Sequence, residues 1–285
     1  MATLSTAQEL LLPLIEPGKA MPWLTTKLLK LRTELRPRDF YLAFSAASRF
    51  VPQTVVKPVG SLLRDIEASY PNFSATEWTQ DQLARIILMC ALPEDRNQAI
   101  LDDLFATADY RELVALYKGL YWLPNAADFV GRAREGSRTN MTGVFDALAL
   151  DNPFPAAYLP EDAWNQLVLK GMFMSRPMYR FYRIEDRKNP TLAAIFLDYA
   201  EERWSAHRAV SPELWRFVDG YVADRFMPGL IKTATEGEPL ERQAALRVLI
   251  NSDFPAAQAW VRSQNVTTET LPDWDTIGRE NEVWD

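Results

Sequence analysis

The chain has 285 residues, of which 48% are hydrophobic and 24% are charged, and its net charge is −7. This composition can bury a core and excludes a disordered chain, and the acidic balance argues against a nucleic-acid binder. The single cysteine, Cys90, excludes an intramolecular disulfide and favours a reducing compartment.

The N-terminal residues MATLSTAQELLLPLIEPGKAM lack a basic leader region, and Pro13 and Pro17 interrupt their apolar stretch. Nowhere does an apolar run approach the roughly 18 residues that a membrane helix needs. We therefore expect a cytoplasmic protein without stable membrane insertion.

Apolar residues recur at helical spacing along nearly the whole chain, which predicts short amphipathic helices. The clearest stripes are Leu83, Ile86, Ile87 and Cys90; Leu101, Leu104 and Phe105; Leu113, Leu116, Tyr117 and Leu120; and Leu192, Ile195, Phe196 and Tyr199. Only residues 53–59, QTVVKPV, look extended, and the flanking prolines argue against a central strand there.

Helix starts are marked by proline followed by acidic residues, at 93–95 and 160–162, and by Ser211-Pro212-Glu213. Short helices between such turns predict an all-α fold of stacked antiparallel helical hairpins, similar to HEAT or armadillo arrays, with a single continuous core. We expect this helical domain to span residues 1–263. Residues 264–285 carry six acidic residues against Arg279 alone, and we expect a mostly irregular acidic tail.

Several classes of chemistry lack the residues they need. His207 is the only histidine, so Cys/His zinc sites and di-iron sites are incomplete, and its position near a helix end favours a capping role. The glycines of GRAREGSR (131–138) lack the lysine and hydroxyl of a phosphate loop. We expect no metal site and no cofactor.

The most informative stretch is positively charged within this acidic protein. Residues 170–188 hold six cationic residues against Glu185 and Asp186, a balance of +4. If the segment is helical throughout, Arg176, Arg180 and Arg183 share one face. With neighbouring polar residues, the candidate binding residues are Arg138, Asn140, Asn165, Lys170, Arg176, Tyr179, Arg180 and Arg183.

This cluster has two interpretations. It can form an anion pocket, because guanidinium groups bind phosphate and carboxylate in bidentate fashion. It can also form a buried ion-pair network that joins neighbouring helices, with Asp146, Asp198, Glu201 and Glu202 as partners. We favour the structural network, because such networks are the usual cause of this pattern.

The same region resembles the EboA family, in three segments: REGSRTNMTGVFDALALDNPFPAAYLPEDAWNQLVLKGMF, RPMYRFYRIEDRKNP and DYAEERWSAHRAVSPELWR. The resemblance implies a bacterial cytoplasmic protein encoded in a gene cluster for a secondary metabolite. Companion genes of that cluster resemble a prenyltransferase, a metal hydrolase, a sugar-phosphate isomerase-like barrel and a dehydroquinate-synthase-like enzyme. The resemblance assigns no catalytic residues.

From this resemblance we expect a non-enzymatic accessory or scaffold protein of secondary-metabolite biosynthesis or export. Its partners would be other proteins of the cluster or a small pathway metabolite. The alternative is an enzyme of unknown reaction acting on a small anionic or prenylated intermediate. Whether the chain is an enzyme at all stays open at this stage.

Overall fold

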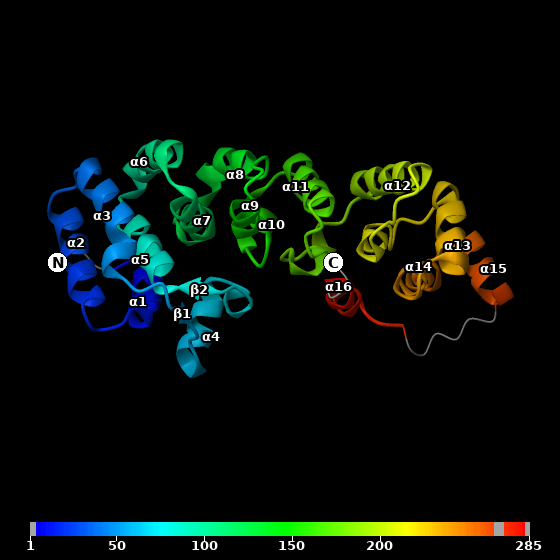
Figure 1. Ribbon diagram of the computed structural model, residues 1–285, viewed down its shortest axis with the longest axis horizontal. Helices are drawn as coiled ribbons and strands as arrows, with labels where there is room; N and C mark the ends of the chain where they lie inside the picture. The colour runs from blue at the N-terminus through cyan, green and yellow to red at the C-terminus, as the bar shows by residue number, and fades with distance from the viewer. Residues whose placement is uncertain (1–3, 265–270, 283–285) are drawn as a thin grey trace. The chain divides into compact units, whose positions relative to one another are not determined.

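A computed structural model describes residues 4–264 and 271–282. The chain divides into two compact units, residues 1–164 and 165–285, and the boundary lies within helix α11 (Glu161–Phe173). Helices make up most of both units (Figure 1), which confirms the all-α class. The single continuous core that we expected over residues 1–263 stays a prediction. The stacked-hairpin arrangement stays a prediction.

The first unit contains mostly short helices joined by tight turns. Its elements are α1 (Thr6–Leu11), η1 (Leu12–Leu14), α2 (Ala20–Thr33), α3 (Pro37–Phe50), β1 (Val55–Val56), α4 (Gly60–Ser69), η2 (Phe73–Ala75), β2 (Trp78–Thr79), α5 (Gln80–Met89), α6 (Glu94–Thr107), α7 (Tyr110–Gly119), η3 (Leu120–Trp122), η4 (Ala126–Phe129), α8 (Val130–Gly136), α9 (Thr142–Ala149) and α10 (Pro153–Tyr158), where η denotes a 3-10 helix.

The core of the first unit follows a row of helices in which α3 contacts α5, α5 contacts α7, and α7 contacts α9. Helix α5 lies at the centre of this row, and Leu83, Ile86 and Ile87 of its predicted stripe have no exposed surface. Arg85 is also buried there; it donates to Asp81 at 2.7 Å and to the Phe44 carbonyl at 3.2 Å. A buried guanidinium is stable only with such partners.

The predicted extended segment forms one short strand. Within β1, Val55 lies opposite Thr79 of β2 and Val56 lies opposite Trp78, in antiparallel register. The flanking Pro52 and Pro58 confine the pairing to two residues, because proline has no N–H to donate to a ladder. The two-residue strand pair therefore connects residues 55–56 to the chain directly before α5.

The second unit is built around α14 and the buried 3-10 helix η7. Helix α14 contacts α13, α15, α16 and η7, and α16 also contacts η5 and η7. Besides α11, the elements are η5 (Met178–Arg180), η6 (Glu185–Arg187), α12 (Pro190–Ser205), η7 (Pro212–Phe217), η8 (Asp224–Phe226), α13 (Met227–Glu236), α14 (Pro239–Asn251), α15 (Pro255–Gln264) and α16 (Trp274–Glu282).

The C-terminal residues differ from the expected irregular tail. Residues 274–282 form helix α16, in which Trp274, Ile277 and Gly278 are buried. Their spacing of three and four residues gives the segment an apolar face, and packing that face stabilises a helix too short to persist alone. The acidic composition hid this amphipathic pattern. Residues 265–270 and 283–285 of the expected tail lie outside the described residues.

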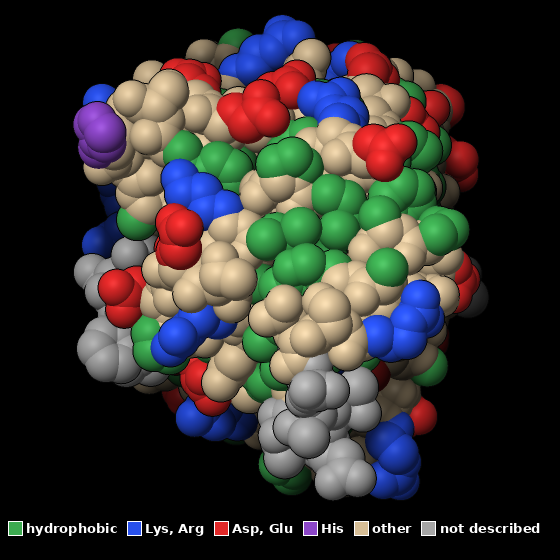
Figure 2. Space-filling view, turned by 90° about the vertical axis from the view of Figure 1, so that its right-hand side faces the viewer, with side chains coloured by type: hydrophobic (Ala, Val, Ile, Leu, Met, Phe, Trp, Pro, Cys, Tyr) green, Lys and Arg blue, Asp and Glu red, His purple; other side chains and the backbone are tan. Residues whose placement is uncertain are grey.

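One face of the second unit carries exposed apolar surface. Figure 2 shows hydrophobic side chains gathered there between charged ones, on the side that carries α13, α14 and α15. Ile231, Leu240 and Trp260 of these helices are only half-buried. Apolar surface of this kind is common where one protein meets another.

The cap of α10 provides a test of the first unit. Asn152 is buried; its side chain accepts from the Phe154 amide at 2.9 Å and donates to the carbonyls of Tyr117 and Ala147. Asn152→Ala should lower the free energy of unfolding by about 1–3 kcal/mol, because a cap is lost and two buried carbonyls lose a donor. Urea denaturation measures this. The exposed Asn251→Ala should stay within about 0.5 kcal/mol of wild type, and equal effects of both changes would contradict the assignment.

Candidate functional site

A buried and charged site of the second unit starts from the 3-10 helix η7, whose six residues PELWRF are all buried. A 3-10 helix has about three residues per turn, so Glu213 and Arg216 lie on the same side of it. Arg216 Nη1 lies 3.1 Å from Glu213 Oε1. The sequence placed Glu213 at a helix start, and its side chain points inward there and pairs with Arg216.

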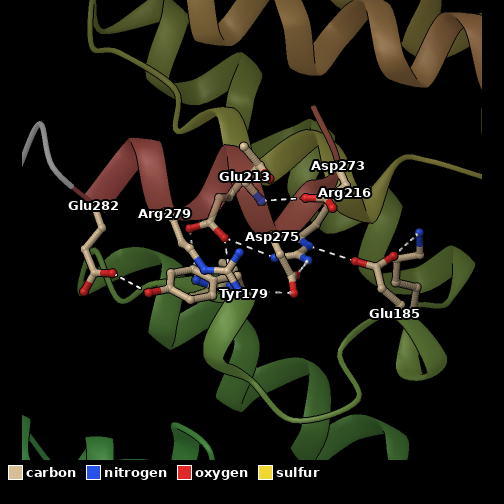
Figure 3. Close-up of polar contacts among 11 residues, drawn as sticks. Tyr179, Glu185, Glu213, Arg216, Asp273, Asp275, Arg279 and Glu282 are labelled. Carbon is tan, nitrogen blue, oxygen red and sulfur yellow. Dashed lines mark hydrogen bonds and ion pairs between the residues drawn. The ribbon is translucent and has the colours of Figure 1, made fainter. Parts of the chain in front are cut away.

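The Arg216 guanidinium has no exposed surface, and each of its nitrogens has a carboxylate partner (Figure 3). Nε donates to Glu185 at 2.9 Å, Nη1 to Glu213 at 3.1 Å, and Nη2 to Asp275 at 3.3 Å. The three acids come from η6, η7 and α16. One buried side chain thus joins segments that are up to 90 residues apart in sequence, from 185 to 275.

Glu213 has further partners in the 3-10 helix η5. Its Oε2 accepts the Met178 amide at 3.0 Å, and its Oε1 accepts the Tyr179 amide at 2.8 Å. Burial raises the pKa of Glu213, and the Arg216 guanidinium and these two N–H groups oppose that rise. The first amides of a helix point outward without partners within the helix, so a carboxylate at this position satisfies them.

Further charges and rings line the rim of the site. Lys188 pairs with Glu185 at 2.8 Å, and Arg279 lies 3.9 Å from Asp275. The Tyr179 hydroxyl donates to Glu282 at 2.6 Å, and the Arg279 guanidinium lies 5.4 Å from the Tyr179 ring centre. Burial, followed by the hydrogen bond to Glu282, raises the pKa of Tyr179 to about 12. These pairs join three cations, Lys188, Arg216 and Arg279, to three carboxylates, Glu185, Glu213 and Asp275.

A family model described as metabolite traffic protein EboA matches residues 8–219. The chain belongs to the EboA family. Neither the comparison with curated proteins nor that with solved structures finds a match. The EboA match ends just after η7, so it includes Glu185, Glu213 and Arg216 of the ion network but not Asp275.

The eight candidate residues that we chose from the sequence belong to both units. Arg138 and Asn140 belong to the first unit, and the other six belong to the second. None of Arg138, Asn140, Lys170 and Arg180 is without an interaction partner. The proposed common binding site therefore stays a prediction.

Arg176, Arg180 and Arg183 do not share a helical face, which corrects that part of the prediction. Helix α11 ends at Phe173, Ser175 has φ +52° and Arg183 has φ +54°, and 3-10 helix η5 lies between them. A left-handed residue breaks a helix, and Pro177 adds a second break because it lacks an N–H. Arg176 donates to the Met174 carbonyl at 2.9 Å, and the exposed Arg183 pairs with Asp186 at 2.6 Å.

The two remaining candidates, Asn165 and Tyr179, also have structural partners. Asn165 and Asn189 exchange hydrogen bonds between their buried side-chain amides at 3.2 and 2.8 Å, and the Asn189 oxygen also caps α12 through the Leu192 amide. Tyr179 belongs to the rim described above. Asn165 therefore stabilises the start of α12. Both the oxygen and the nitrogen of its side-chain amide bond to Asn189.

The centre of the site, Arg216, was missed as a candidate, although Glu185 was noted as an opposing acid. The signal was present: in PELWRF, two opposite charges lie three residues apart among apolar residues. Buried charges within so apolar a run require partners. Of the acids that we expected to complete a network, Asp198 pairs instead with Arg225, at 2.6 Å on the surface.

The single cysteine and histidine have structural surroundings. Burial raises the pKa of the Cys90 thiol to about 12, and its sulfur donates to the Trp122 carbonyl at 3.7 Å. A thiol with this pKa holds little thiolate near neutral pH, which supports a structural role. His207 follows the end of α12 with φ +54° and donates its amide to the Trp204 carbonyl, which confirms its predicted place at a helix end.

Residues 4–264 and 271–282 contain no group of three or more acidic, histidine or cysteine side chains placed to hold a metal ion. Over the same ranges, no helix combines the length and the apolar character that crossing a bilayer requires.

Arg216→Met should lower the free energy of unfolding by about 3–5 kcal/mol, because it leaves the buried Glu213 carboxylate without its cation. Chemical denaturation followed by circular dichroism measures the change. The matched control is Arg183→Met, which removes an exposed pair with Asp186 and should cost less than about 1 kcal/mol. A loss for Arg216→Met no larger than that of the control would show that the network contributes little to folding.

Proposed function

We propose that the chain is a non-enzymatic accessory protein of bacterial secondary-metabolite biosynthesis or export, acting in the cytoplasm by binding a partner protein of the same pathway. The description of its family as metabolite traffic protein EboA supports a role in metabolite traffic. The acidic balance and the single cysteine support a soluble protein of a reducing compartment.

The main support for an accessory role is that the buried Arg216 guanidinium is fully engaged by carboxylates of the protein itself. All three of its nitrogens donate to carboxylates, and the side chain has no exposed surface. An anion-binding arginine needs donor positions that face its ligand. The fully buried cation of the site is therefore used for structure, which supports binding of a partner through other surfaces.

Two surfaces support partner binding. The half-buried apolar side chains of α13, α14 and α15 gather on one face of the second unit (Figure 2). The cationic residues of 170–183, which include Lys170, Arg176, Arg180 and Arg183, stay the proposed contact for an acidic partner or a small anionic metabolite. A second candidate function, an enzyme acting on such a metabolite, is an outcome of the experiment below.

Deletion of the gene within an otherwise intact cluster distinguishes the two functions. An accessory role in traffic predicts that pathway chemistry continues while the product is redistributed between cells and medium. Quantitative mass spectrometry of both fractions should show product retained inside the cells, and a wild-type copy supplied in trans should restore the distribution. Accumulation of one upstream intermediate, with product absent from both fractions, would contradict the accessory role and assign a catalytic step to the chain.

A further inference from the structure

Helix α16 covers the ion network from outside the family match. It docks on a face, here called the α16 docking face, that consists of Tyr179, Glu213, Arg216, Asp219 and Arg247. The first four of these residues lie within residues 8–219, and α16 spans residues 274–282. The EboA match therefore includes most of the docking face and none of the helix that covers it.

The α16 docking face recognises a helix with a specific pattern. The buried Trp274 donates its indole N–H to Asp219 at 2.8 Å, and the Arg247 guanidinium lies 5.6 Å from its ring centre. Ile277, the second apolar anchor of α16, is fully buried one turn further along. A tryptophan and an isoleucine at this spacing are typical anchors of an amphipathic helix bound to a partner surface.

At Gly278, helix α16 lies too close to the docking face for any side chain to fit. A Cβ atom at Gly278 would lie 2.6 Å from Glu213 Oε1 and 2.8 Å from the Tyr179 Cβ atom. The docking face therefore selects a helix with glycine at this position. Acidic residues complete the match, since Asp275 accepts from Arg216 and Glu282 accepts from Tyr179 (Figure 3).

The polar contacts that hold α16 are only partly buried. The Asp275 and Arg279 side chains are more than half exposed, although Asp275 pairs with the buried Arg216. Exposed ion pairs stabilise weakly, and a helix of nine residues does not persist in isolation. Arg216 retains Glu185 and Glu213 when Asp275 departs, so the network can survive the loss of α16.

We infer that the α16 docking face is a binding site for an acidic amphipathic helix of a partner protein, and that α16 occupies it in cis until such a helix replaces it. The inference rests on the proposed partner-binding function. The recognised helix carries tryptophan, aspartate, isoleucine and glycine at the positions of residues 274, 275, 277 and 278. Competition between α16 and the partner makes binding conditional on the partner's concentration.

The test uses the full chain and a fluorescein-labelled peptide of residues 271–282, LPDWDTIGRENE. Gly278→Leu in the protein should displace α16 and open the face, and fluorescence anisotropy should then detect binding of the peptide. The wild-type chain should bind at least about 10-fold more weakly, because a tethered helix competes at an effective concentration in the millimolar range. The matched control is Glu280→Leu, which adds the same side chain at an exposed position of α16 and should behave as wild type.

Peptide variants test the recognition pattern. Replacement of the peptide's own tryptophan by alanine, or of its glycine by leucine, should abolish binding to the Gly278→Leu protein. If that protein does not fold, Asp275→Arg provides a second displaced state, because it places a cation beside Arg216. A folded displaced variant that binds no peptide, or a wild-type chain that binds equally well, would overturn the inference.

One further outcome also overturns the inference. A wild-type chain that dimerises with rising concentration, and whose dimer is dissolved by the peptide, would assign the face to α16 of a second copy. The peptide experiment and the metabolite measurement in the deletion strain are independent. Failure of peptide binding would therefore overturn this inference and leave the proposed function to be decided by the deletion strain.

Discussion

The second unit depends on the burial of one positive charge. A guanidinium removed from water is stable only if its donors meet acceptors of opposite charge. Arg216 meets this requirement with carboxylates from three segments, and Glu213 in turn accepts two backbone amides of η5. The irregular chain between α11 and α12 is thereby tied to η7.

The first unit uses the same solution on a smaller scale. Arg85 is buried within α5 and pairs with Asp81 one turn earlier, while its Nε donates to a backbone carbonyl of α3. Both arginines join elements that are distant in sequence. Their N–H groups donate to acceptors of the protein itself, whereas binding of an anionic ligand would require such donors to face the ligand. This shared use of buried charge is why we propose binding through surfaces, in keeping with a family described by metabolite traffic.

The regular helices could be predicted from the sequence because their signals are local. Stripes such as Leu83, Ile86 and Ile87 mark the buried side of α5, and the Pro-Glu-Asp start at 93–95 marks the beginning of α6. The network could not be predicted in the same way. Arg216 and Asp275 are 59 residues apart, and their pairing requires α16 to return to η7.

The prediction failed where backbone conformation departs from the residue pattern. The spacing of Arg176, Arg180 and Arg183 is helical, yet left-handed residues at 175 and 183 interrupt the chain. Neither residue is a glycine or an asparagine, which are the usual signals of that conformation. The charge of the segment was visible in the sequence, but the direction of each side chain depended on these two residues.

Residue-resolved hydrogen exchange at the amides of Met178 and Tyr179 tests the central claim most directly. Both amides donate to the buried Glu213 carboxylate that pairs with Arg216. If the network holds this segment, both should exchange at least about 10³-fold more slowly than in an unstructured peptide, which corresponds to ~4 kcal/mol of opening free energy. Exchange of both amides at the rate of an unstructured peptide would show that the network does not hold the segment, and would contradict the account.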